Sequence, residues 1–231
     1  MKIREFLSPG ITIHNDLNPL LWDKDHLKPE VKKKLYLIAQ HFKKFVDVDF
    51  PVVDIIITGG QTGKYYTSQS DLDLHLITDY RQIDCDQELE ELFDTKRMLY
   101  KKRYDIQIKG IEVELYVEDI NQPAIGGAYS IINDKWIKPS TSPKQNINQT
   151  DITKHAEKLS SLIQHSLSSN DLETLERVKN FISLYRRQGL SKDGEYGVAN
   201  LAFKSIRNSG LIDQLRNKIK DLESEKLSLR Q

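Results

Sequence analysis

Two aspartates two residues apart, Asp71 and Asp73, are residues whose type and spacing could do chemistry. They belong to a segment in which polar and apolar residues alternate, with Leu72, Leu74 and Leu76 at the apolar positions. This alternation predicts a β-strand with the leucines turned inward. Side chains two positions apart on a strand lie about 6.6 Å apart at Cα and point to the same side, so both carboxylates can converge on one point above a sheet.

A third carboxylate is offered by the segment 111–118, which alternates in the same way. Its polar positions include Glu112 and Glu114, and either could join the two aspartates if the strands paired. Carboxylates about 6 Å apart repel by roughly 3 kcal/mol per pair at an effective dielectric constant near 20, which would raise their pKa values unless a cation were bound. Because all the ligands are hard oxygens, Mg²⁺ or Mn²⁺ is the cation that fits.

A paired-glycine turn precedes the aspartates. The β-branched run 55–57 predicts a short buried strand, and Gly59 and Gly60 follow it where the exit turn needs a permissive backbone. Backbone N–H groups in such a turn can bind an anion. The stretch 59–64 is not a P-loop, because its spacing is one residue short and Tyr65 stands where a metal-binding Ser or Thr is required.

The order of these features resembles the signature of the DNA polymerase β-like nucleotidyltransferase superfamily: a glycine turn, a spacer of ten residues, Asp-Leu-Asp and a later strand acid. More closely, the segments SDLDLH, GIEVELYV and ANLAFK resemble, in this order, segments of the small predicted nucleotidyltransferases of tailed bacteriophages. The resemblance covers most of the chain. It implies an enzyme that transfers a nucleoside monophosphate from a nucleoside triphosphate to a hydroxyl acceptor and releases pyrophosphate.

The resemblance also implies roles for individual residues. In the superfamily the two strand acids and the third acid bind two metal ions, which here assigns catalysis and metal binding to Asp71, Asp73 and Glu114, with Mg²⁺ or Mn²⁺ as the cofactor. Glu114 is preferred because the segment 113–115 resembles the hydrophobic-acid-hydrophobic triplet that the family uses there. Glu112 remains the competing candidate.

The nucleotide-binding residues that the resemblance implies are Gly59, Gly60 and Ser70. Many family members have Gly-Ser at the turn and use the serine hydroxyl to contact phosphate, whereas the second position here is Gly60. Thr62, Ser68 or Ser70 would have to replace that donor. This departure supports the alternative function, a catalytically inactive nucleotide-binding or phage interaction protein of the same fold. Three mutually repelling carboxylates argue against it, because such a module has no evident need for them.

Other polar and aromatic residues near these motifs have a structural and a functional interpretation. For His75, on the acidic face, a structural hydrogen bond is favoured over proton transfer. For Tyr65 and Tyr66, packing under the turn is favoured over stacking on a base. The acceptor stays open, because RNA, a protein and a small molecule are all compatible with the sequence, as is any nucleoside triphosphate.

The candidate site residues must be positioned by strands and helices, and the order of these expected elements predicts an α+β fold. This fold is a small mixed β-sheet with flanking helices, followed by a helical bundle. We expect helices over 29–46 and 84–103, and hairpins over 104–117 and 128–138. The segment 139–150 is poor in apolar residues and rich in Pro, Ser, Asn and Gln, which is typical of a linker. The predicted domains are therefore a nucleotidyltransferase-like catalytic domain, 1–140, and a C-terminal helical domain, 151–231.

Four helices are predicted in the C-terminal domain, over about 152–167, 172–185, 196–206 and 211–222. Gly189 and Gly210 are expected to end the second and third helices, and the fourth is expected to fray into the last nine residues. The resemblance implies that this bundle closes over nucleotide or acceptor. Its candidate cations for that role are Arg186, Arg187, Lys192 and Arg207.

The composition limits the classes of partner, covalent cross-link and cellular compartment that the chain can have. The chain has 34 basic and 34 acidic residues, so no global basic field marks it as a nucleic-acid binder, although a local basic groove is compatible. Its single cysteine, Cys85, cannot form an intramolecular disulfide or a Cys-based zinc site and is consistent with a reducing compartment. Because no apolar run is long enough for a signal peptide or a membrane span, we expect a cytoplasmic protein without a membrane partner, in the host cytoplasm if the chain is phage-encoded.

Overall fold

The computed structural model describes residues 14–67, 70–84, 88–122, 126–140 and 148–229. The chain divides into two compact units, Thr12–Ser142 and one that contains Pro143–Gln231. The predicted linker lies mostly outside the described residues, and so do Ser68 and Cys85. No helix in the described ranges is both long enough and apolar enough to cross a membrane.

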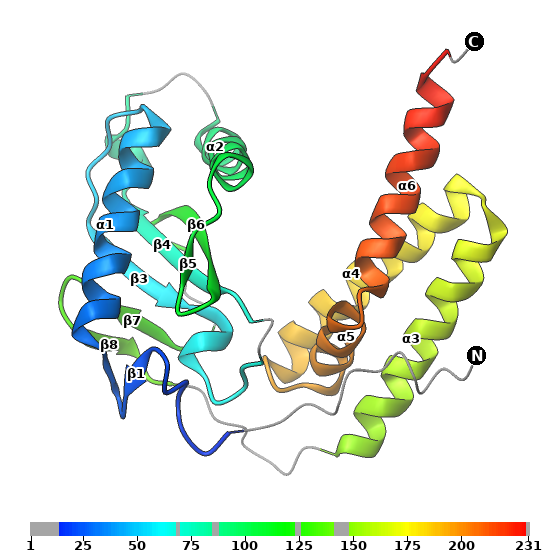
Figure 1. The fold of residues 1–231 in the computed structure, drawn as a ribbon, viewed down its shortest axis with the longest axis horizontal. Coiled ribbons are helices and arrows are strands. Elements are labelled where there is room, and N and C mark those ends of the chain that lie inside the picture. The colour runs from blue at the N-terminus through cyan, green and yellow to red at the C-terminus, as the bar shows by residue number, and fades with distance from the viewer. Residues whose placement is uncertain (1–13, 68–69, 85–87, 123–125, 141–147, 230–231) are drawn as a thin grey trace. The chain divides into compact units, whose positions relative to one another are not determined.

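The first unit contains a mixed six-stranded sheet in the order β5-β6-β4-β3-β7-β8 (Figure 1). Its strands are Asp54–Thr58 (β3), Leu72–Thr78 (β4), Gln107–Ile108 (β5), Ile111–Asp119 (β6), Ala128–Ser130 (β7) and Lys135–Lys138 (β8). Among these described strands only β4 and β6 pair in parallel. A separate small antiparallel pair is formed by Trp22–Asp23 (β1) and His26–Leu27 (β2). The predicted α+β fold class is confirmed.

Two helices pack on the leucine face of this sheet. They are α1, Pro29–Val46, and α2, Leu89–Arg103. Leu72, Leu74 and Leu76 are at most 1% exposed and share one core with apolar side chains of both helices, so the predicted inward direction of the leucines is correct. The helices also touch each other, because the rings of Phe42 and Tyr100 meet edge to face at 5.0 Å. The opposite face of β4 and β6 carries mostly polar side chains, with Ile77 as an apolar member.

Short turns complete the first unit. The 3₁₀ turns are η2, Gly59–Thr62, directly after β3, and η3, Tyr80–Gln82, directly after β4. The first of these contains the paired glycines Gly59 and Gly60. Because η2 follows β3 immediately and β3 pairs with β4, the glycine turn lies at the end of the sheet where β4 begins.

The second unit is helical, as predicted. Its helices, shown in Figure 1, are Gln149–Ser169 (α3), Leu172–Asp193 (α4), Val198–Asn208 (α5) and Leu211–Leu227 (α6). They share a second apolar core. Asn148 and Asp171 cap α3 and α4, because their side chains accept hydrogen bonds from the first-turn amides of Thr150 and Thr174. Gly210 has a φ of +78° and follows α5 where the sequence predicts the stop.

Two predicted helix ends in this unit are wrong. α4 does not end at Gly189 but continues to Asp193, before Gly194 with its φ of +71°. A Cβ at Gly189 would lie 2.3 Å from that of Ala199, so this glycine lets α5 approach α4 instead of ending the helix. α6 does not fray at residue 223 but continues to Leu227, because Glu, Lys and Leu favour helix.

Candidate active site

Three carboxylates meet where β4 and β6 run side by side. Asp73 of β4 and Glu114 of β6 are direct partners in the parallel register, and both lie on the face opposite the buried leucines. Asp71 comes one residue before β4 and points to the same side. Each of the three partly buried acids offers an oxygen, and these oxygens all lie within 4.8 Å of one another. The structure therefore brings together the three acids that the sequence singled out.

The strand register distinguishes Glu114 from Glu112. Glu112 lies two residues earlier on β6, where it pairs with Gln107 of the edge strand β5. It is exposed, and it does not belong to the group of close carboxylates found among the described residues. The geometry favours Glu114 as the third acid, because it stands directly beside Asp73.

Lys101 of α2 contacts both glutamates. Its Nζ lies 2.5 Å from Oε1 of Glu114 and 2.8 Å from Oε1 of Glu112. On the other side Tyr116 donates its hydroxyl to Oε2 of Glu114 at 2.8 Å, and the guanidinium of Arg97 lies 4.8 Å from the centre of the Tyr116 ring. Both oxygens of Glu114 are therefore held by side chains of α2 and β6.

These contacts set the charge of the third acid. Burial raises the pKa of Glu114, but hydrogen bonds from Lys101 and Tyr116, together with the charges of Lys101 and Arg97, outweigh it and hold that pKa below its ordinary value. Burial lowers the pKa of Lys101, and the two glutamates more than compensate, so that its pKa lies above the ordinary value. Glu114 is consequently anionic and paired with a cation of the same chain.

Gly59 allows the glycine turn to approach the acids. Its φ is +77°, in the left-handed region that favours glycine, and a Cβ placed there would lie 1.9 Å from Oδ2 of Asp73. Any side chain at this position would occupy the space of the Asp73 carboxylate. The turn and the acid are thus packed against each other.

Gly60, by contrast, has room for a side chain. A Cβ there would lie 3.6 Å from the carbonyl oxygen of Tyr65 and 3.8 Å from Oγ of Ser70. Of the proposed replacements that the structure describes, Ser70 is therefore the neighbour of this position. Thr62 is fully buried, and its hydroxyl already contacts the carbonyl oxygens of Gly59 and Gly127 at 2.8 and 2.9 Å. Thr62 is used structurally.

A buried glutamine supports the turn, and sequence reasoning missed it. The side chain of Gln61 donates to the carbonyl oxygen of Ser70 at 3.0 Å and accepts from Nδ2 of Asn18 at 3.0 Å. Trp22 donates its indole N–H to the backbone carbonyl of Gln61 at 2.9 Å. These contacts fix the turn to the residue before Asp71. No local pattern marks them, because their partners are far apart in sequence.

His75 follows Asp73 by two residues on the same face of β4 and is buried. Its Nε2 is 2.8 Å from Oγ1 of Thr58, and its ring stacks on Tyr116 with 4.7 Å between centroids. Its Nδ1 lies 3.0 Å from Oε1 of Glu118, within ion-pair distance but without hydrogen-bond direction. This contact with His75 holds the pKa of Glu118 below its ordinary value. The arrangement agrees with the structural interpretation of His75.

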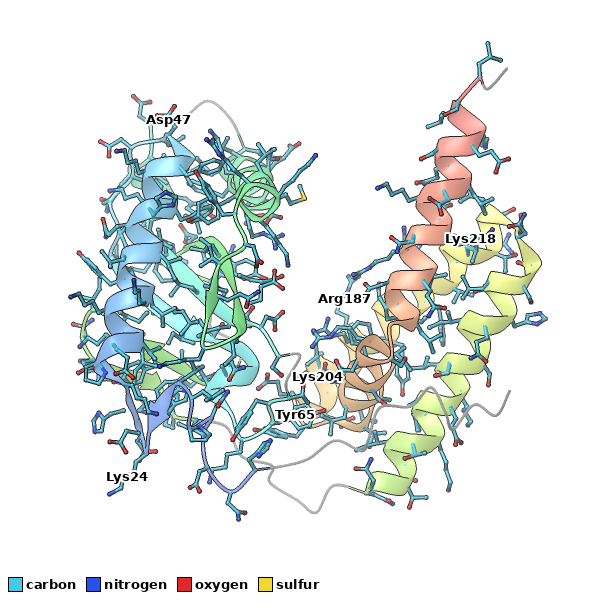
Figure 2. The ribbon with its side chains drawn as sticks, viewed as in Figure 1. Lys24, Asp47, Tyr65, Arg187, Lys204 and Lys218 are labelled. Carbon is cyan, nitrogen blue, oxygen red and sulfur yellow. The ribbon has the colours of Figure 1, made fainter. Side chains whose placement is uncertain are left out.

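The tyrosines of the spacer also agree with packing. Tyr65, labelled in Figure 2, is 4% exposed. Tyr66 stacks on the ring of His14 with 3.8 Å between centroids, and Nε2 of that histidine lies 3.0 Å from the carbonyl oxygen of Tyr66. Tyr65 is therefore too buried to serve as a base-stacking platform, and one face of the Tyr66 ring is already covered by His14.

The donor set fits a hard divalent cation. Carboxylate oxygens are the ligands that Mg²⁺ and Mn²⁺ prefer, and three of them within 4.8 Å can bind one cation together. Asp71, Asp73 and Glu114 are the residues that would hold it. The glycine turn beside Asp73 adds backbone N–H groups, which have no partner in the first turn of a helix and can contact an anion.

No protein-family model matches the chain, and no curated protein matches it. Matches among solved structures include the STING-associated CdnE c-di-GMP synthase of Capnocytophaga granulosa, at 14% identity and a TM-score of 0.22, over 87% of this chain and 83% of that chain. Another is the CdnE cyclic dinucleotide synthase of Elizabethkingia meningoseptica with GTP and Apcpp, at 12% identity and a TM-score of 0.27, over 83% and 78%.

Proposed function

We propose that this chain is a metal-dependent nucleotidyltransferase, which moves a nucleoside monophosphate from a nucleoside triphosphate to a hydroxyl acceptor and releases pyrophosphate. The observation that carries the proposal is the trio Asp71, Asp73 and Glu114, whose oxygens lie within 4.8 Å beside a glycine turn. At that distance and a dielectric constant near 20, each pair of charges repels by about 3.5 kcal/mol. A fold that keeps such a trio together has a use for a cation there.

Each residue of the site has a role in this proposal. Asp71, Asp73 and Glu114 bind Mg²⁺ or Mn²⁺, which when bound supplies Lewis-acid stabilisation at the α-phosphorus and a lower pKa of the acceptor hydroxyl. Asp73 is rigid, because the leucines on either side of it are fully buried. Tyr116 orients Glu114 through its hydroxyl.

The glycine turn is proposed to hold the triphosphate. Gly59 and Gly60 offer backbone N–H groups, and Ser70 places a hydroxyl beside the position where related enzymes have serine. The acceptor is RNA, a protein or a small molecule. Cytoplasmic localisation and the link to tailed bacteriophages stay predictions.

The direct test is transfer of label. The protein is incubated with each α-labelled nucleoside triphosphate and Mg²⁺ or Mn²⁺, against RNA, against protein and in buffer alone, and both label transfer and pyrophosphate are measured. The fraction that takes up label identifies the acceptor. Absence of transfer and of pyrophosphate release in every combination would contradict the proposal.

A matched pair of variants tests the third acid. Glu114→Gln and Glu112→Gln change neighbouring positions on the same face of β6, and both acids contact Lys101. We expect Glu114→Gln to lose at least about a hundredfold in transfer rate, because an amide binds a hard divalent cation poorly, and Glu112→Gln to lose less than about threefold. The reverse order would assign the role to Glu112.

A second candidate function rests on Gly60. If the Ser70 hydroxyl does not replace the missing serine, the same fold would bind a nucleotide without turnover, as a nucleotide-binding or phage interaction protein. Ser70 already accepts a hydrogen bond from the amide of Thr67 at 2.9 Å, which fixes its oxygen in place. Calorimetry separates the two functions: triphosphate binding in the presence of Mg²⁺ without any pyrophosphate release favours the second.

A further inference from the structure

A cavity of about 280 Å³ lies among three helices of the second unit, apart from the acidic site in the sheet. Its wall combines the middle of α4 with Phe203 of α5 and the first turns of α6. Part of the wall is apolar, formed by Ile182, Leu190, Phe203, Ile212 and Leu215. All the lining residues belong to the same compact unit. The cavity is therefore a property of the helical unit itself.

Four cations line the same cavity. They are Lys179, Arg186 and Arg187 of α4 and Arg216 of α6, and no residue of the lining is acidic. On α4 the spacing of seven and eight residues places the three cations on one side of the helix, two turns apart. Figure 2 labels Arg187, which is exposed. Arg216 has an acidic neighbour on its own helix, Asp213, at a loose 3.8 Å.

Arg186 is oriented by its neighbours before any ligand arrives. Its Nε donates to Oδ1 of Asn200 at 3.2 Å, and its guanidinium lies 4.4 Å from the centre of the Phe203 ring. Asn200 is 1% exposed, and its Nδ2 donates to the backbone carbonyl of Glu195 at 2.7 Å, which fixes the amide. A guanidinium held in this way loses less conformational freedom when it binds an anion.

We propose that this cavity binds the phosphate group of a small organic phosphate of nucleotide size. Phosphate fits better than a single carboxylate, because it carries more charge and more acceptor oxygens for four cationic side chains. The apolar wall fits the organic part of such a ligand. Small-molecule pockets usually measure about 300–1,000 Å³, so a cavity of this size admits a mononucleotide or a similar phosphate ester and not a longer polymer. Binding at this site needs no metal ion.

The experiment is nuclear magnetic resonance of the full chain with ¹³C-labelled isoleucine methyl groups, in EDTA. Ile182 and Ile212 line the cavity and report on it, whereas Ile55 and Ile57 of β3 report on the sheet. The probes are AMP, adenosine and inorganic phosphate at millimolar concentration. We expect AMP to shift the Ile182 and Ile212 signals saturably, inorganic phosphate to do so more weakly and adenosine to leave them unchanged.

Variants of the cationic side chains test whether they bind the phosphate group. In the double variant Arg187→Gln and Arg216→Gln, AMP should bind at least about tenfold more weakly, because each lost charge-assisted hydrogen bond costs about that factor. Both side chains are exposed, so this variant should fold. The matched control is Arg177→Gln on α4, an exposed arginine that pairs with Glu173 outside the cavity lining. It should bind AMP like the wild type.

Three results would overturn the proposal. One is the absence of AMP-dependent shifts at Ile182 and Ile212, and another is an equal response to adenosine. The third is AMP affinity that the double variant retains. Because the measurement is made in EDTA and read at the helical unit, it is independent of label transfer at the acidic site, so either proposal can fail without the other.

Discussion

Replacing Lys101 with methionine should strengthen metal binding at the acidic site. Lys101 is the cation that contacts Glu114 in the structure, and its side chain and a divalent ion would compete for the same carboxylate oxygen. Methionine keeps the unbranched stem and removes the charge. The variant should therefore be less stable than the wild type without metal and should recover that loss when metal is added.

The size of the effect follows from the exposure of the pair. The Lys101 side chain is 53% exposed and that of Glu112 is 48%, so solvent screens both contacts although Glu114 itself is only 19% exposed. An exposed ion pair contributes at most about 1 kcal/mol, and only the contact with Glu114 competes with a metal ion. Its removal corresponds to a gain of up to about fivefold in metal affinity.

The assay is calorimetric titration of Mn²⁺ into the wild type, into Lys101→Met and into Lys102→Met, with melting temperatures measured in parallel. Lys102 is the adjacent exposed lysine of α2 and serves as the control for loss of one positive charge, because the described contacts of Glu112 and Glu114 involve Lys101 instead. If Lys101→Met bound Mn²⁺ more weakly than the control, the lysine would be holding Glu114 in place for the metal, and the competition argument would be refuted.

Three further predictions concern the same unit. Asp73→Asn should fold normally and lose transfer activity at least about a hundredfold, whereas Leu74→Asn should cost roughly 2–4 kcal/mol of unfolding free energy, because it buries an unpaired amide; urea titration with the label assay checks both. Gly59→Ala should destabilise the protein more than its matched control Gly110→Ala, because both glycines have similar positive φ but only the first Cβ would meet Asp73; comparison of their melting temperatures tests this. Asp79→Asn should flatten the acid dependence of stability. Hydrogen bonds from Arg81 lower the pKa of Asp79 from 3.8 to about 2, so its contribution is complete above about pH 4 and lost as the pH falls through 2; equal slopes of wild type and variant in urea titrations over that range would exclude this role.

The strands and the acids they carry could be predicted from the sequence, because a period of two determines both the strand and the face of each residue. Asp71, Asp73 and the leucines between and after them follow this rule directly. The choice between Glu114 and Glu112 could not be derived from the alternation, since both lie on the same face. It depends on the register between β4 and β6, which is set by long-range pairing.

What the sequence could not predict is mostly a contact between distant residues. In the sequence Gln61 is an ordinary polar residue, and its role in supporting the glycine turn follows only from its hydrogen bonds with Asn18 and Trp22. The prediction that Gly189 ends a helix is wrong, because a glycine inside a helix and a glycine that ends one give the same local sequence pattern. Only the close approach of Ala199 shows that this glycine lies inside the helix. Helix packing overrides the local preference at that position.

The parallel pairing of β4 and β6 makes the position of Lys101 beside Glu114 depend on the number of residues between the two strands. Parallel neighbours cannot be joined by a tight turn, so the chain between them must cross back over the sheet, and α2 makes that crossing. An insertion between Lys101 and the end of α2 at Arg103 would rotate the lysine by about 100° for each inserted residue and carry it away from Glu114. The last turn of α2 should therefore tolerate exchange of its exposed residues Lys102 and Arg103 far better than a change of its length.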